Sequence, residues 1–146
     1  MTRKCLLVLW SFALFIALDP LYGQSHQIYQ KTLGNGLDVI VIPNPTVPLV
    51  TVEIDVKNGG YTEGAEYTGL SHLYEHMFFK ANKTIPNQER YLERLRELGA
   101  TWNGSTGDER VNYFYTLPKD SLVPALQFMY DAITSPLFLQ DELVKE

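Results

Sequence analysis

The chain has 146 residues, a formal net charge of −5 and a single cysteine, Cys5. An acidic chain without a run of basic residues does not suit the phosphate backbone of nucleic acids, so we expect no nucleic-acid partner. Because there is no second thiol, no internal disulfide can form, and the fold must rest on a packed core or on a partner.

The first residues have the layout of a secretory signal peptide. A short basic start is followed by an almost wholly apolar stretch from Cys5 to Leu18, and the small residue Gly23 precedes the expected cut. We therefore expect a signal peptide at 1–23 and export to the periplasm or the extracellular medium. The apolar stretch is shorter than the ~20 residues of a spanning helix, so no stable membrane anchor is expected. An uncleaved signal anchor is the alternative.

The mature chain begins with predicted strands. Two short strands are expected at 28–32 and 37–42, joined by a turn at Asn35-Gly36. A proline-containing loop at 43–48 leads to a third strand at 49–57, whose apolar and polar residues alternate as in a strand with one buried face.

Four helices and a second hairpin are predicted in the rest of the chain. The helices are expected over 69–80, over 88–98, over 120–134 and from about 140, and the hairpin strands over 101–106 and 110–117. On the third helix the buried stripe is predicted to be Leu122, Leu126, Met129 and Ile133. This order of elements predicts an α+β fold, in which helices pack on a largely antiparallel sheet.

The pentapeptide from His72 to His76 has the H-x-x-E-H spacing of a zinc-binding helix. Each residue of a helix turns by about 100°, so His72, Glu75 and His76 share one sector, opposite an apolar side. Imidazole nitrogens bind zinc, and a carboxylate beside a metal-activated water can take its proton. The pattern predicts a hydrolytic Zn²⁺ site with both histidines as metal ligands and Glu75 as the catalytic general base. The alternative is an amphipathic helix whose histidines are ordinary surface residues.

Several motifs occur in a fixed order along the chain. They are Leu33–Leu37, Gly69–Lys80, Leu98–Asn103, Tyr113–Tyr115 and Leu117-Pro118. Together, over about residues 28–146, they resemble the N-terminal domain of the insulinase/pitrilysin metallopeptidases. The resemblance implies a zinc endopeptidase acting on peptides or small proteins, with a second homologous domain or subunit. Residues 24–146 would then be a truncated N-terminal part of the catalytic domain.

The resemblance also places two residues outside the pentapeptide. Glu146 matches a family glutamate that orients a ligating histidine from outside the metal shell, while the family's third zinc ligand would fall near position 153. Asn103 matches the edge strand that binds extended substrate backbone in this family. The alternatives are a solvent-facing residue for Glu146 and an ordinary surface residue for Asn103.

Two rival functions follow from the same residues. Some relatives are inactive subunits that bind peptides or act as scaffolds, and a purely structural secreted metal-binding domain is a third possibility. The intact His72, Glu75 and His76 favour the enzyme, because an inactive subunit has no need to keep them. Departures from the usual motif at Ser71, Tyr74 and 80–82 leave the substrate preference open.

Overall fold

The computed structural model describes residues 27–146, which divide into two units at Pro45 and Thr46. The predicted signal peptide at 1–23 lies outside the described residues. Within residues 27–146, no helix is both long and apolar enough to cross a membrane.

The first unit contains an antiparallel hairpin. Strand β1 (Tyr29–Thr32) pairs with β2 (Asp38–Val41). Gly36 closes the turn with a φ of +86°, a conformation that suits glycine because it has no Cβ. The amide of Gly36 donates to the carbonyl of Leu33 at 2.9 Å. The hairpin predicted from Asn35-Gly36 is therefore confirmed, with strands one or two residues shorter than expected.

The second unit is built on a three-stranded antiparallel sheet in the order β3-β5-β4. Its strands are β3 (Leu49–Val56), β4 (Thr101–Thr106) and β5 (Val111–Pro118). Alternate residues of β5, from Val111 to Leu117, are buried, as the sequence pattern predicted. The residues between them, such as Asn112, lie on the other face of the sheet, so only one face is available to the core.

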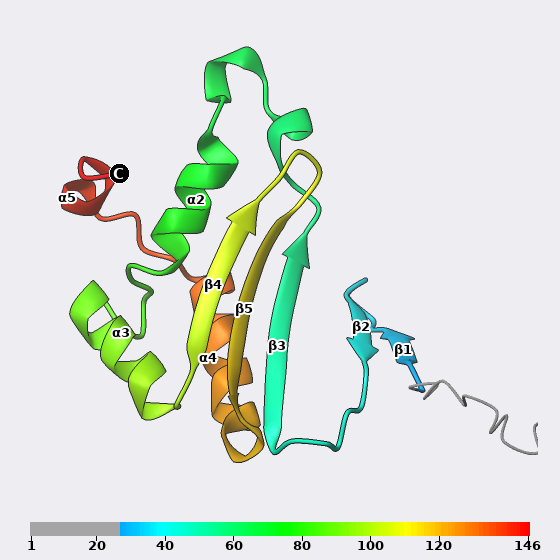
Figure 1. Cartoon of the computed structure of the whole chain (residues 1–146). Helices are drawn as coiled ribbons and strands as arrows, with labels where there is room; N and C mark the ends of the chain where they lie inside the picture. The colour runs from blue at the N-terminus through cyan, green and yellow to red at the C-terminus, as the bar shows by residue number, and fades with distance from the viewer. Residues whose placement is uncertain (1–26) are drawn as a thin grey trace, which may run out of the picture. The chain divides into compact units, whose positions relative to one another are not determined.

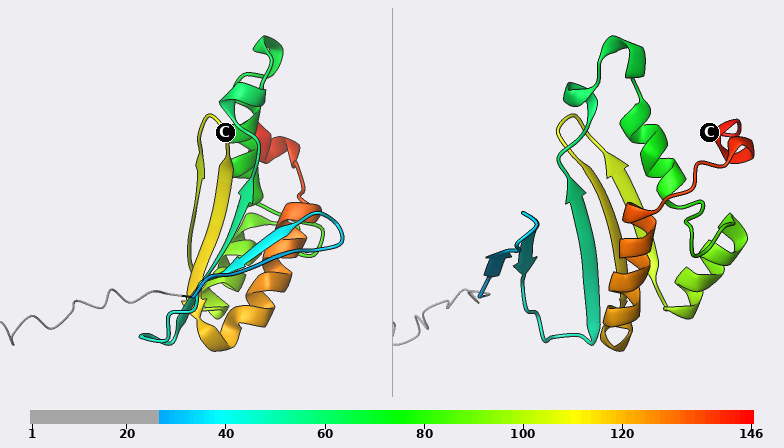
Figure 2. Two further views of the ribbon diagram at one scale, coloured as in Figure 1. Left: turned by 90° about the vertical axis from the view of Figure 1, so that its right-hand side faces the viewer. Right: turned by 180° about the vertical axis from the view of Figure 1, so that it is seen from behind.

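The helices gather on that buried face (Figures 1 and 2). Helices α2 (Leu70–Phe78) and α4 (Leu122–Thr134) pack on the sheet, and α3 (Gln88–Glu97) lies next to them. Short turns of helix complete the unit: η1 (Gly60–Thr62), η2 (Ala65–Tyr67), η3 (Lys119–Ser121) and α5 (Gln140–Leu143). The predicted α+β class with an antiparallel sheet is confirmed.

Aromatic side chains fill the space between the sheet and the helices. The rings of Phe78 on α2 and Tyr113 on β5 stack with centroids 4.0 Å apart. The hydroxyls of Tyr91 on α3 and Tyr115 on β5 are hydrogen-bonded at 3.0 Å, and burial raises the pKa of both phenols. Each fully buried ring contributes on the order of 2 kcal/mol of transfer free energy, so this core fixes α2 and α3 against β5.

The predicted buried face of α4 is partly wrong. Leu126 was expected in the core but is 48% exposed, whereas Ala125, Phe128 and Ala132 are buried with Met129. The small alanines let the helix backbone approach the sheet, and the ring of Phe128 packs against Tyr91 with centroids 4.6 Å apart. Close packing by small residues and one aromatic ring therefore set the orientation of this helix, not the larger leucines.

Candidate active site

Helix α2 begins at a carboxylate cap supplied from an earlier loop. The two oxygens of Glu63 accept the backbone amides of Gly69 and Ser71, each at 2.7 Å. These amides belong to the first turn of the helix, where no intrahelical acceptor exists and where negative charge is favoured. Hydrogen bonds from Ser71, through its side chain and its amide, and from the amide of Gly69 lower the pKa of Glu63. Glu63 therefore fixes the start of the helix that carries His72.

Three predicted site residues lie together on α2. His72 and His76 are exposed and Glu75 is half-buried. The Nε2 atoms of His72 and His76 are 3.1 Å apart, and the two rings meet edge to face at 84°. Two nitrogens bound to one tetrahedral zinc lie about 3.3 Å apart, given Zn–N bonds of about 2.0–2.1 Å. The two imidazoles thus fit adjacent corners of a zinc tetrahedron.

The histidine pair supplies only part of a metal shell. Among residues 27–146 there is no cluster of three or more histidine, cysteine, aspartate or glutamate side chains placed to hold a metal ion. The acidic residues Asp108 and Glu109 lie in the turn between β4 and β5. The described residues therefore offer two imidazole ligands and open positions for further ligands.

Glu146 lies against the outer nitrogen of His76. Its Oε2 pairs with Nδ1 of His76, and its Oε1 forms an ion pair with Nζ of Lys80 at 2.6 Å. A carboxylate can only accept, so Nδ1 of His76 donates this bond, and in the neutral ring Nε2 is then the unprotonated nitrogen that a metal ligand requires. The structure thus brings Glu146 into contact with His76, and its orienting role stays a prediction.

The Lys80 ammonium group pairs with two carboxylates, one within α5 and one just after it. It is within 3.4 Å of Glu142 in addition to Glu146, and both lysine and carboxylates are mostly shielded from solvent. Hydrogen bonds from Lys80 and then His76 lower the pKa of Glu146, and the bond to Glu146 raises the pKa of Lys80. Glu146 is therefore ionised at neutral pH and remains an acceptor for His76.

The carboxylate of Glu75 lies against strand β4. Its Oε2 accepts a hydrogen bond from Oγ1 of Thr106 at 2.8 Å. Thr106 was not identified from the sequence. The signal that could have found it is the alternation of β4, which puts Trp102, Gly104 and Thr106 on the face that packs against α2.

Asn103 is not beside the histidines. It is exposed on β4 and, by the same alternation, lies on the sheet face opposite to Gly104 and Thr106. Among the described strands, β4 pairs only with β5, so its other edge has free backbone groups. Strand β4 therefore contacts the candidate site through Glu75, and its outer edge is unpaired among the described strands.

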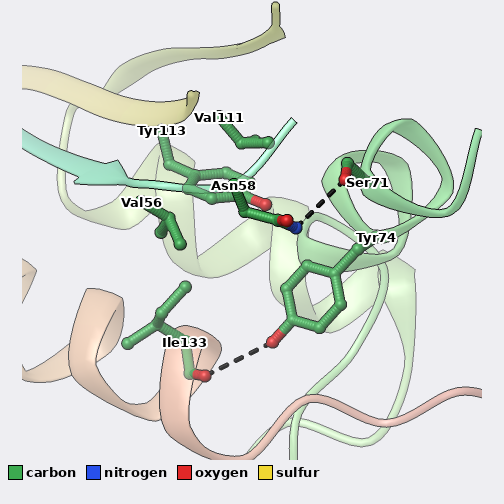
Figure 3. A pocket seen from close by; sticks show the side chains of 7 residues that line it. All are labelled: Val56, Asn58, Ser71, Tyr74, Val111, Tyr113 and Ile133. Carbon is green, nitrogen blue, oxygen red and sulfur yellow. Dashed lines mark hydrogen bonds between the residues drawn. The ribbon is translucent and has the colours of Figure 1, made fainter. Parts of the chain in front are cut away.

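A separate pocket of about 290 Å³ lies on the other flank of α2 (Figure 3). It is lined mainly by Val56, Asn58, Ser71, Tyr74, Tyr113 and Ile133. The side-chain amide of Asn58 donates through Nδ2 to the Ser71 hydroxyl at 3.0 Å. The Tyr74 hydroxyl donates to the backbone carbonyl of Ile133 at 3.4 Å. Neither histidine lines it, so this pocket is distinct from the face of α2 that carries His72 and His76.

The family model of the insulinase family (peptidase family M16) matches residues 38–146. The chain is 32% identical over 114 residues to the human insulin-degrading enzyme, covering 78% of this chain and 11% of that protein. It is equally similar, at 32% over 114 residues, to an uncharacterized zinc protease of Rickettsia felis, covering 78% of this chain and 27% of that protein. The chain therefore belongs to the insulinase family of peptidases.

Solved structures agree with this assignment. A protease from Helicobacter pylori superposes with a TM-score of 0.75 at 25% identity, over 82% of this chain and 29% of that one. Pitrilysin superposes with a TM-score of 0.69 at 28% identity, over 80% of this chain and 12% of that one. The chain thus spans 11–29% of the length of these four relatives, and the predicted family and fold are confirmed.

Proposed function

We propose that this chain forms part of the catalytic site of an exported zinc-dependent metalloendopeptidase that hydrolyses peptides or small proteins. The observation that carries the proposal is the 3.1 Å separation of the Nε2 atoms of His72 and His76, with Glu75 on the same helix. The names of the relatives support it, since they include a zinc protease and an insulin-degrading enzyme.

In this proposal His72 and His76 hold zinc through their Nε2 atoms, and Glu146 keeps His76 in the required tautomer. When bound, zinc would lower the pKa of a water molecule and polarise the scissile carbonyl. Glu75 takes a proton from the attacking water and later gives it to the departing amine. A third protein ligand, which the family resemblance puts near position 153, would complete the shell.

The free edge of β4 is the proposed site for extended substrate. An added strand can bind through main-chain hydrogen bonds, which hold a peptide without demanding one sequence. Asn103 would then bind substrate from this strand, beside the helix that carries Glu75. Replacing Asn103 by alanine should raise KM several-fold and leave kcat nearly unchanged, and an unchanged KM would remove Asn103 from the binding site.

The partner and the compartment follow from the same proposal. Because the chain spans only 11–29% of the matched peptidases cited above, a second homologous domain or subunit is expected to complete the enzyme. Export rests on the sequence pattern at 1–23. Mass spectrometry of the native N-terminus would test it, since a cleaved protein begins at about Gln24 and an intact Met1 would contradict cleavage.

The decisive test is Glu75→Gln in the full-length protein. We expect bound zinc to be retained and turnover of an internally quenched peptide to fall by about 10²–10⁴-fold, since the amide cannot accept the proton. Glu89→Gln makes the same change at an exposed position of α3 and should leave kcat as it is.

The same measurement separates the rival functions. An inactive peptide-binding or scaffold subunit would show no turnover with Glu75 intact, yet would bind peptide. Turnover that survives Glu75→Gln would exclude Glu75 as the general base.

A further inference from the structure

The carboxylate of Glu75 lies unusually close to strand β4. A Cβ placed on Gly104 would be 2.9 Å from Oε1 and 3.0 Å from Cγ of Glu75. Ordinary contacts of a Cβ are wider than 3.4 Å, so the side chain of Glu75 rests directly on the strand where no side chain intervenes. This contact places the carboxylate beside the next residue on the same strand face, Thr106.

The two oxygens of Glu75 have different surroundings. Oε2 accepts the Thr106 hydroxyl at 2.8 Å, while Oε1 makes no hydrogen bond to any other group within residues 27–146. A hydrogen bond to an ionised acceptor is stronger than one between neutral groups. One oxygen is therefore tied to the strand and the other is left to accept a proton from elsewhere.

The strand that carries Thr106 is itself fixed. Thr106 pairs with Val111 and Gly104 pairs with Tyr113, and both partners on β5 are buried. Farther along the same face, the rings of Phe79 and Trp102 pack with centroids 4.5 Å apart, which joins the end of α2 to β4. The hydroxyl therefore sits on a rigid element, which is the condition for holding a catalytic group in one place.

We propose that Thr106 is a positioning residue for Glu75. Its hydroxyl holds Oε2 against β4, while Oε1, which makes no hydrogen bond within residues 27–146, is left to accept a proton from the attacking water. Without this bond the long glutamate side chain has several rotamers available, and only some direct an oxygen at the water. This inference rests on the proposed role of Glu75 as general base.

The test compares two replacements of Thr106 in the full-length protein. Thr106→Val keeps the shape and the β-branch but removes the hydroxyl, whereas Thr106→Ser keeps the hydroxyl. With an internally quenched peptide as substrate, we expect Thr106→Val to lower kcat by about 10- to 100-fold with little change in KM. Thr106→Ser should restore most of the loss. Thr51→Val, the same change at an exposed position of β3, serves as the matched control and should keep kcat.

Two readouts do not depend on turnover. Zinc affinity, measured by competition with a chromogenic chelator, should be unchanged in Thr106→Val, because Thr106 contacts neither histidine. A crystal structure of the zinc-free Thr106→Val protein should show Glu75 in more than one rotamer, whereas Thr106→Ser should keep a single one.

The outcomes distinguish this inference from the function it rests on. Normal kcat in Thr106→Val, together with an inactive Glu75→Gln, would overturn the positioning role and leave the peptidase assignment intact. A Thr106→Ser variant as slow as Thr106→Val would also overturn it, because the hydroxyl would then not be the group that matters. Active Glu75→Gln would instead remove the general-base role on which this inference rests, and a natural protein without turnover would remove the proposed function itself.

Discussion

Glu75 and His76 are neighbours in the sequence, but different parts of the chain hold them. Glu75 is bound by Thr106 on β4, a strand fixed in the sheet, through one hydroxyl. His76 is bound by Glu146, which follows the four-residue helix α5 and is held in turn by the ion pair with Lys80. A sheet residue holds the proposed general base, whereas a network of ion pairs holds the proposed metal ligand.

This difference separates two kinds of failure. Ion pairs are weakened by salt, whereas β4, although an edge strand, is held by its backbone pairing with β5 and moves only when that pairing opens. Disturbing the region after α5 should therefore affect zinc binding first. Disturbing β4 should affect the proton-transfer step first.

The largest effect on zinc affinity is expected from Glu146→Ala in the full-length protein. The substitution removes the acceptor that orients His76 and leaves Lys80 with only the longer contact to Glu142. Loss of such an orienting partner typically lowers metal affinity about 10–100-fold, and we expect a decrease of this size in chelator competition.

Glu142→Ala is the matched control for this comparison. It removes a carboxylate that also contacts Lys80 but does not touch His76, so zinc affinity should change much less. Equal losses in the two variants would mean that the charge around Lys80 matters and the contact with His76 does not.

The smallest effect is expected from Glu63→Gln, which should lower thermal stability. Glu63 binds the start of α2 and contacts neither Glu75 nor His76. A neutral amide loses the favourable charge at the helix start, and we expect Tm at pH 7 to fall by about 1–3 °C. Because the folded-state pKa of Glu63 lies below its ordinary value of 4.5, its contribution is complete above that value. It is lost as the pH falls through the lowered pKa.

Thermal unfolding at several pH values checks this prediction. The difference in Tm between the natural protein and Glu63→Gln should be constant near neutrality and disappear in acid. A difference that grows in acid would show that Glu63 is not stabilised as a carboxylate at the start of α2. Glu66→Gln, an exposed acid in the same loop, is the control.

Strong local patterns made much of the fold predictable. The alternation in β5 identified its buried residues because successive side chains of a strand point to opposite faces. The turn at Asn35-Gly36 was predictable because Asn-Gly is a favoured hairpin turn pair. Glycine readily adopts the positive φ that Gly36 has in the structure. The rotation of α4 was not, since Leu126 and Phe128 are both apolar and only contact with Tyr91 decides between them.

The sequence by itself determined the chemical content of the candidate site. The spacing of His72, Glu75 and His76 puts two imidazoles and a carboxylate on one sector of a helix whatever surrounds that helix. Helical geometry also brings the two Nε2 atoms within range of one metal ion, because residues four apart are neighbours on a helix.

Only the tertiary structure decided which groups hold those side chains. Glu63, Thr106 and Glu146 are 8, 31 and 70 residues from their partners Ser71, Glu75 and His76, and no periodic pattern links residues so far apart. These contacts exist because the sheet brings β4 beside α2 and because Lys80 pairs with Glu142 in α5 and with Glu146 just after it. The residues that carry the chemistry are local in sequence, and the residues that position them are not.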